Sequence, residues 1–360
     1  MGGVLMQLPA FVIAYSDSSF TNPHETARPD EPSECTGNFT HMGAKYWGFE
    51  TTRHRATSVL ESNDGFRFDH NAHHWINLGL KQPSQVNRIT ISTKWFTGNH
   101  VPEVSVELIR DGRTHEVLTR VTLAPDQDHS FDIEPTEADE CLVRCFHEGG
   151  IARINLHGEP LNQDSDPENL LQHATISHVS NEHYGKPHDA VIGERQVDYM
   201  LGWESARSGF GEYALFHLRA PTRVSEVIVD TYLHRLNPPL SCHIFGIQLQ
   251  NESELEDIWQ ARPSWAIEFD DGSQVIPDNF RSYMQEKRYL EEPAGNHASF
   301  NVKLLNRDER WLPIISFGRL FADKWHRFSE IETSEPITHL LYTHYPNGGI
   351  HGLKVYGEES

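Results

Sequence analysis

Residues 149–159 carry the sequence Gly-Gly-Ile-Ala-Arg-Ile-Asn-Leu-His-Gly-Glu, and residues 348–358 carry Gly-Gly-Ile-His-Gly-Leu-Lys-Val-Tyr-Gly-Glu. In each stretch a glycine pair precedes a segment in which apolar and polar residues alternate, which is the period of a strand with one buried face. The two stretches lie near the middle and at the end of a chain of 360 residues. We therefore expect each to be the closing strand of one half of the protein.

Two further segments recur upstream, in the same order in both halves. Residues 48–53 are Gly-Phe-Glu-Thr-Thr-Arg, and residues 202–207 are Gly-Trp-Glu-Ser-Ala-Arg. The alternating segment 86–93 is matched by the segment 224–231. Unrelated domains that share Gly-Gly turns by accident would not keep this order, and the repeat is far longer than the unit of a solenoid. The sequence therefore predicts a duplicated domain.

Strand patterns dominate both halves. Apolar segments are short, alternate with polar residues and are separated by Gly, Pro, Asn and Asp, while helical periodicity is scarce. This pattern predicts an all-β protein made of two tandem jelly-roll β-sandwiches of the galactose-binding-like type. We expect the first repeat at residues 1–160, a polar, proline-flanked linker at 161–168 and the second repeat at 169–360.

The second half is lengthened by an insertion at about residues 248–306. The inserted segment is acidic and aromatic, and a short helix is expected at residues 252–260. Long insertions on a rigid β scaffold usually form loops that cover a site or a partner surface.

The charge balance excludes several classes of partner. The formal net charge is −22 and no cluster of Lys or Arg is present, whereas nucleic-acid binders need a basic face. Apolar runs stay below the roughly 18 residues that a membrane-spanning helix needs. We expect no nucleic acid and no membrane as partners. An anionic ligand would need local positive charge against this overall field.

Neither the first residues nor the cysteines indicate export. A basic start is lacking, Pro9 interrupts the apolar run, and the alternation from Phe11 to Tyr15 favours a first strand. The four cysteines are scattered. Cys141 and Cys145 would lie about 13 Å apart in a strand, which is too far for a disulfide. A cytoplasmic location is therefore expected.

At its repeats the sequence resembles the allantoicase family. The first half carries Trp-Gly-Phe-Glu-Thr-Thr-Arg at 47–53, Ala-His-His-Trp at 72–75, Trp-Phe-Thr-Gly-Asn at 95–99 and His-Glu-Gly-Gly-Ile-Ala-Arg at 147–153. The second half carries Leu-Gly-Trp-Glu-Ser-Ala-Arg at 201–207, Val-Asp-Thr at 229–231 and Pro-Asn-Gly-Gly-Ile at 346–350. The resemblance covers nearly the whole chain outside the insertion. It implies an oligomeric hydrolase that cleaves allantoate to ureidoglycolate and urea.

Several positions depart from the pattern of that family. The aspartate expected before Gly-Trp-Glu is Trp47 in one half and Leu201 in the other. The aspartate at the strand end is present as Asp230 but is Ser92 in the first half, and the Gly-Asn turn has no match after Tyr232. The chain is therefore either a divergent member or a paralogue whose substrate has changed.

Cleavage of allantoate would need a general acid, a general base and a group that holds the substrate carboxylate. The matched motifs supply three catalytic candidates, which are Glu50, His73 and Glu204. The substrate-binding candidates in these motifs are Arg53, Asn99, Arg207, His147 and Glu148. The two arginines are chosen because a guanidinium group binds a carboxylate at two points. Each type has a structural alternative: a Glu–Arg ion pair that holds a loop, a turn asparagine, or an exposed loop histidine.

No cofactor is predicted. The spacing of His70, His73 and His74 invites a metal site, but zinc needs three or four suitably placed ligands and no further ligand stands out in the sequence. These three histidines are therefore only weak metal candidates.

Two classes of function remain open. The first is an allantoicase-like hydrolase of a C–N bond to a ureido or guanidino group, with allantoate or another ureido or guanidino acid as its small-molecule substrate. The second is a non-catalytic module that binds a small ligand or a carbohydrate, since the tryptophans would suit a sugar-binding surface. Convergence of the candidates in one cleft between the halves would favour the enzyme. A homo-oligomer is expected from the resemblance alone.

Overall fold

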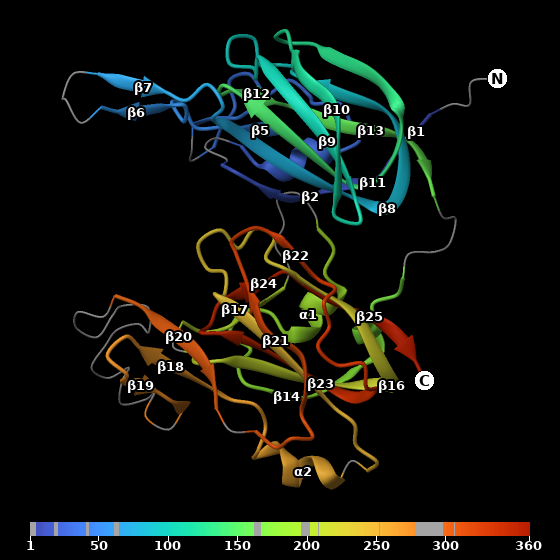
Figure 1. The fold of residues 1–360 in the computed structure, drawn as a ribbon, viewed down its shortest axis with the longest axis vertical. Helices are drawn as coiled ribbons and strands as arrows, with labels where there is room; N and C mark the ends of the chain where they lie inside the picture. Colours follow the sequence, from blue (N-terminus) through green and yellow to red (C-terminus); the bar gives the residue numbers. More distant parts are fainter. Residues whose placement is uncertain are drawn as a thin grey trace. The chain divides into compact units, whose positions relative to one another are not determined.

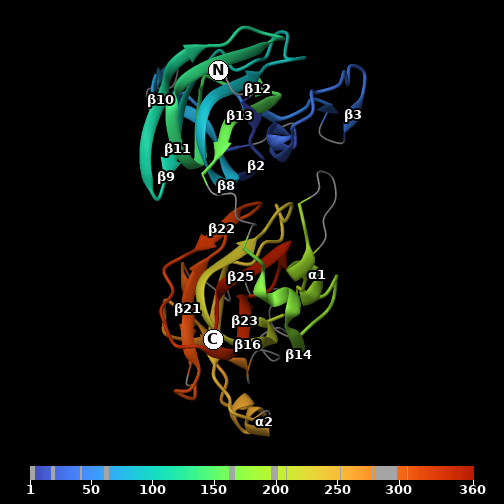
Figure 2. The same ribbon diagram turned by 90° about the vertical axis from the view of Figure 1, so that its right-hand side faces the viewer.

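The computed structural model describes residues 5–17, 21–40, 43–60, 65–161, 167–195, 202–207, 209–251, 253–277, 279, 298–305 and 307–360. The chain forms two compact units, Met1–Asp166 and Pro167–Ser360 (Figures 1 and 2). Each unit is built on a seven-stranded antiparallel sheet, so the prediction of an all-β fold with two repeats is confirmed.

The first unit is a sandwich whose layers are joined by two long strands. The strands are β1 (Met6–Gln7), β2 (Ala10–Tyr15), β8 (His73–Ser92), β9 (Glu103–Arg110), β10 (Arg113–Thr122), β11 (Asp128–Phe146) and β13 (Arg153–Pro160). Their order is β1-β13-β8-β11-β9-β10, and β2 also pairs with β8. The first part of β8 pairs with β2 and its last part with β13, while β11 pairs with β8 along its length. β8 and β11 therefore belong to both layers.

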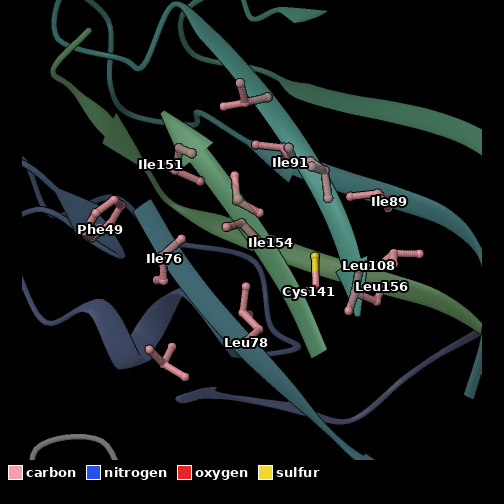
Figure 3. Close-up of a cluster of buried hydrophobic side chains, with 14 of the residues drawn as sticks. Phe49, Ile76, Leu78, Ile89, Ile91, Leu108, Cys141, Ile151, Ile154 and Leu156 are labelled. Atoms are coloured by element: carbon pink, nitrogen blue, oxygen red, sulfur yellow. The ribbon is translucent and has the colours of Figure 1, made fainter. Parts of the chain in front are cut away.

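Aliphatic side chains fill the interior of the first unit (Figure 3). The alternation within β8 places Ile76, Leu78, Ile89 and Ile91 inside, where none of them is exposed to solvent. All four cysteines of the chain are buried and free. Burial raises the pKa of the Cys141 thiol to about 12, which leaves it an apolar core residue.

The second unit repeats this topology. Its strands are β14 (Thr175–Val179), β16 (Glu212–Asp230), β17 (Ser241–Ile247), β21 (Leu312–Arg319), β22 (Trp325–Phe328), β23 (Ile337–Tyr345) and β25 (Gly352–Glu359). The order is β14-β16-β23-β17-β21, and β22 and β25 also pair with β16. β16 thus takes the place of β8, and β25 the place of β13. β23 and β22 divide between them the pairing that β11 makes in the first unit.

The inserted segment adds a layer to the second unit. It contains α2 (Ser253–Trp259), as the sequence predicts, and a three-stranded sheet of β18 (Trp265–Phe269), β19 (Gln274–Val275) and β20 (Phe300–Leu304). Trp265 and Trp311 join Phe245 and Tyr345 in a separate buried cluster. Residues 252, 278, 280–297 and 306 of the insertion lie outside the described residues.

The remaining short elements lie in the loops. They are η1 (Pro23–Ala27), β3 (Phe39–Thr40), β4 (Gly43–Ala44), β5 (Phe49–Glu50), β6 (Thr57–Val59), β7 (Phe66–Phe68), β12 (Gly150–Ile151), η2 (Leu170–His173), α1 (Pro187–Ile192), β15 (Trp203–Glu204) and β24 (Gly349–Ile350). β5 pairs with β12, and β15 pairs with β24, so each repeat ties its Gly-x-Glu segment to its closing Gly-Gly-Ile segment. Within the described part of the chain, the helices are too short and too polar to cross a membrane.

Candidate functional site

Glu50 is positioned by the closing turn of the first repeat. The β5–β12 pairing sets Glu50 opposite Gly150. Gly48 has a φ of +87°, and a β-carbon there would collide with the backbone carbonyl oxygen of Ile151, so glycine alone fits. This close approach brings the Glu50 side chain into the protein, where it is only 8% exposed.

The Glu50 carboxyl group is hydrogen-bonded to Asn99. The Asn99 Nδ2 atom donates to Glu50 Oε1 over 2.8 Å, and the Asn99 carbonyl oxygen accepts from the Gly150 backbone N over 2.7 Å. Burial raises the pKa of Glu50, while the Asn99 hydrogen bond and the charge of Arg53 act in the opposite direction. Glu50 is therefore a carboxyl group that binds a proton more readily than an exposed glutamate does.

Two arginines of the segment that follows Glu50 act on the groups of this site. Arg53 and Arg55 are both exposed. The charge of Arg53 acts on Glu50, and that of Arg55 acts on His74. Within the described ranges, neither arginine forms an ion pair with a carboxylate. They therefore supply the local positive charge that an anionic ligand needs in a chain of net charge −22.

His73 and His74 are neighbours on β8, so their side chains leave opposite faces of the strand. His73 is half-buried, and its Nδ1 lies 2.8 Å from the Asn71 carbonyl oxygen. His74 is 1% exposed, and its Nδ1 lies 3.3 Å from Ser16 Oγ. Burial lowers the pKa of His74, and the charge of Arg55 acts in the same direction. The carbonyl partner fixes the His73 tautomer with a proton on Nδ1 and a lone pair on Nε2.

The remaining first-repeat candidates are His147, Glu148 and His70, of which only Glu148 is seen to act on this group. His147 is exposed with a φ of +66°, whereas Glu148 is half-buried and its charge acts on His74. His70 is exposed, and its ring stacks on Phe68 at 6.4 Å. Among the residues that the structure describes, no group of three or more His, Cys, Asp or Glu side chains is arranged to hold a metal ion.

In the second repeat, Glu204 lies opposite Gly349 in the β15–β24 pair, as Glu50 lies opposite Gly150. The Glu204 backbone is bonded in both directions to Tyr184, over 2.9 and 2.7 Å. Arg207 is exposed, and its carbonyl oxygen accepts from the Asn347 side chain over 2.9 Å. No ion pair between Glu204 and Arg207 is found among the described residues, so the alternative of a Glu–Arg pair that holds this loop finds no support.

A counterpart of Asn99 exists that motif comparison missed. The Gly349 backbone N donates to the Asn237 carbonyl oxygen over 2.9 Å, as the Gly150 N does to that of Asn99. The absence of a Gly-Asn turn after Tyr232 is therefore only the loss of the glycine, which is Leu236 in this repeat. The signal was present in the spacing, because Asn99 follows Thr93 by six residues and Asn237 follows Thr231 by six.

The lost aspartate of the first repeat has a structural explanation. Ser92 lies opposite Arg153 in the β8–β13 pair, and Asp230 lies opposite Gly352 in the β16–β25 pair. Asp230 is bound instead by Arg195 from a preceding loop, through two hydrogen bonds of 2.8 Å. At this cross-strand pair the first repeat therefore has a small serine opposite a large arginine, and the second has an aspartate opposite a glycine. Each combination places one charged side chain and one small residue in the space between the two strands.

The family model described as the allantoicase repeat matches this chain twice, over residues 4–161 and 168–360. The chain belongs to the allantoicase family. Each half is one allantoicase repeat, so the duplication predicted from the sequence is confirmed.

Curated allantoicase relatives match along almost the whole chain. The probable allantoicase of Schizosaccharomyces pombe is 24% identical over 372 residues, covering 97% of this chain and 90% of that protein. The allantoicase of Saccharomyces cerevisiae is 23% identical over 374 residues, covering 96% and 90%. The crystal structure of Saccharomyces cerevisiae allantoicase is 20% identical and covers 97% of this chain and 90% of that one, with a TM-score of 0.34.

Proposed function

We propose that this chain hydrolyses allantoate to ureidoglycolate and urea, with Glu50 as the general acid. The observation that carries the proposal is the buried Glu50 carboxyl group, hydrogen-bonded to Asn99 and flanked by Arg53. Membership of the allantoicase family supports the choice of reaction. The curated relatives of fungi and bacteria that match this chain carry the name allantoicase.

The reaction asks for an acid at the leaving nitrogen. The bond to be cleaved joins a ureido nitrogen to a carbon that also bears a second nitrogen and a carboxylate. Urea departs as a neutral molecule only when its nitrogen receives a proton, while the second nitrogen donates electrons to the carbon. Glu50 suits this step because burial raises its pKa and so keeps more of it protonated near neutral pH.

Arg53 is the proposed clamp for the substrate carboxylate. Its planar guanidinium group can donate two parallel hydrogen bonds to a carboxylate. Arg55, which motif comparison did not single out, adds a second positive charge on the same segment. Because both side chains are exposed and lack an ion pair within the described residues, they are available to an incoming anion.

His73 is the motif's candidate for the base that activates water, although it leaves β8 on the face opposite to His74, on which the charges of Arg55 and Glu148 act. Its Nδ1 donates to the Asn71 carbonyl oxygen, which leaves the Nε2 lone pair to accept a proton. His74 is less suited to direct contact with substrate because it is only 1% exposed. We assign His74 a positioning role through Ser16, whose Oγ also accepts from the Trp75 backbone N over 2.9 Å.

The decisive assay is release of urea from a panel of allantoate, ureidoglycolate and guanidino acids, with and without a chelator. The panel includes guanidino acids because the family aspartate at the strand end is Ser92 in the first repeat. We expect Glu50→Gln to lower kcat on allantoate by about 100-fold or more. Glu159→Gln, at an exposed site on β13, is the matched control. If no compound of the panel releases urea, the proposed reaction is refuted.

Two further features stay predictions. The homo-oligomer implied by the family resemblance is tested by light scattering on the purified chain. The cytoplasmic location is tested by fractionation of cells that express it.

A further inference from the structure

The hairpin of β6 and β7 has one apolar face and one polar face. Its cross-strand pairs are Val59 with Phe66, Thr57 with Phe68, and Ser58 with Arg67. Side chains alternate along a strand, and directly opposed residues share a face. Val59, Phe66 and Phe68 therefore lie on one face together with Thr57, while Ser58 and Arg67 lie on the other.

The apolar face of this hairpin is exposed. Val59 is 72% exposed, Phe66 64% and Phe68 66%, although the ring of His70 stacks on Phe68 at 6.4 Å. None of the three side chains joins a hydrophobic cluster of the described residues. Figure 1 shows the hairpin extending away from the rest of the first unit. Within the part of the chain that the structure describes, the face is left to solvent.

The residue pattern of the hairpin is that of a strand pair covered on one side. Among the described strands, β6 and β7 pair only with each other, and a two-stranded hairpin alone is marginally stable in water. Alternation of apolar and polar residues is typical of a sheet with one buried face. A loop that only meets water has no need of two phenylalanines on the same face. The pattern therefore points to a partner that packs on Val59, Phe66 and Phe68.

The size of the face fits a protein partner. Taking about 200 Å² for a fully exposed phenylalanine, the three side chains offer roughly 350 Å² of apolar surface. A stable interface buries about 800 Å² on each partner, of which slightly more than half is apolar. The hairpin thus supplies most of the apolar area that one side of such an interface needs.

The charge of the segment favours a second copy of this chain as the partner. Two copies that each carry a net charge of −22 repel one another over most of their surfaces. Residues 53–70 contain three arginines and three acidic residues, so this segment is neutral. Electrostatic repulsion between two copies is therefore weakest where the apolar face lies.

We propose that two copies of this chain associate through the apolar faces of their β6–β7 hairpins. The same face of each copy packs against the other about a two-fold axis, with the hairpins about 10 Å apart. Such a contact closes after two copies and leaves no apolar face open. The family resemblance implies an oligomer without naming a surface, and this contact does not depend on the proposed reaction.

The first test is sedimentation velocity of the full chain over a range of micromolar concentrations. Wild-type protein should form a dimer. The double variant Phe66→Ser/Phe68→Ser should raise the dissociation constant by about tenfold or more, because it removes the aromatic contacts. Phe66→Leu/Phe68→Leu keeps the face apolar and should still associate. Arg67→Ser, on the opposite face of the same strand, is the matched control and should associate as wild type does.

The second test asks which face of the hairpin meets the partner. The four cysteines of the chain are buried and free, so an introduced cysteine is the accessible one. A short bis-maleimide should link two copies of Thr57→Cys, on the apolar face, and should not link Ser58→Cys, on the polar face. Circular dichroism establishes that each variant is folded. The proposal is overturned if wild type is monomeric at every concentration, if the double serine variant associates as wild type does, or if Ser58→Cys is linked as readily as Thr57→Cys.

Discussion

Asn99 Nδ2 donates a 2.8 Å hydrogen bond to Glu50 Oε1 between residues that are 49 positions apart in the chain. The contact exists because β5 and the loop after β8 both meet the closing turn at Gly150. It couples the protonation of the proposed acid to the geometry of that turn.

Removal of the Asn99 amide should move the pH profile of the reaction. The hydrogen bond stabilises the Glu50 carboxylate and lowers its pKa, so Asn99→Ala should raise that pKa further above its ordinary value. A general acid works in its protonated form, and the basic limb of kcat/KM should therefore shift to higher pH. The measurement is a pH–rate profile on allantoate. Asn301→Ala, on the exposed side of β20, is the control, and an unmoved limb in Asn99→Ala would count against the acid role of Glu50.

Loss of the Arg53 guanidinium should weaken substrate binding more than turnover. Arg53→Gln removes a charge-assisted pair with the substrate carboxylate, and KM should rise by about tenfold or more. Arg113→Gln, at an exposed position on β10, provides the comparison. Steady-state kinetics on allantoate separate the effects on KM and kcat. A variant with unchanged KM would show that another group holds the carboxylate.

A methyl group at Gly48 should destabilise the first repeat. The residue has a φ of +87°, and its β-carbon would meet the Ile151 carbonyl oxygen, so strain and collision add. We expect Gly48→Ala to lower the free energy of unfolding by about 2 kcal/mol or more. Gly112→Ala, with a φ of +73° and no atom near its β-carbon, isolates the cost of the backbone conformation. Denaturant unfolding measures the free energy of unfolding of both variants. If Gly48→Ala and Gly112→Ala lose the same stability, the structure relieves the collision at Gly48.

Acid should destabilise the second repeat through its buried histidines. Burial lowers the pKa of His243 and His326 to about 4 and that of His344 to about 3. An unfolded histidine binds a proton near pH 6.5, so stability is full above that value and is lost as the pH falls towards 4. Each of the first two histidines should cost about 3 kcal/mol at pH 4. Unfolding measured between pH 7 and pH 4 tests this.

His326→Gln provides the matched variant for the acid experiment. The His326 Nε2 accepts from the Phe321 backbone N over 2.8 Å, and Nδ1 lies 3.0 Å from the Val229 carbonyl oxygen, contacts that an uncharged amide can replace in part. The variant should lose less stability between pH 6.5 and pH 4 than wild type does. If the free energy of unfolding of the variant falls with pH as steeply as that of wild type, groups other than His326 cause the acid sensitivity.

Sequence comparison found Glu50 and Glu204 because each stands in the same repeated segment, two residues after a glycine. Asn237 lacks the preceding glycine of a Gly-Asn pair, and the structure needs only its carbonyl oxygen at Gly349, so the motif does not reveal it. Nor does the motif reveal His234, because nothing in the residues around it signals that its ring replaces Phe96 on the closing turn. The choice between His73 and His74 depended on strand phase, which the motif does not specify.

The sequence by itself determined the duplication, the all-β class and the short helix of the insertion, because alternation, turn residues and ordered repeats are local properties of the chain. Only the tertiary structure decided which side chains meet. Hydrogen bonds such as Asn99 to Glu50, and the burial that lowers or raises a pKa, depend on strands that pair across many residues. The same duplicated motif can therefore bring the Asn99 side chain to Glu50 in one repeat and the Asn237 side chain to His234 in the other.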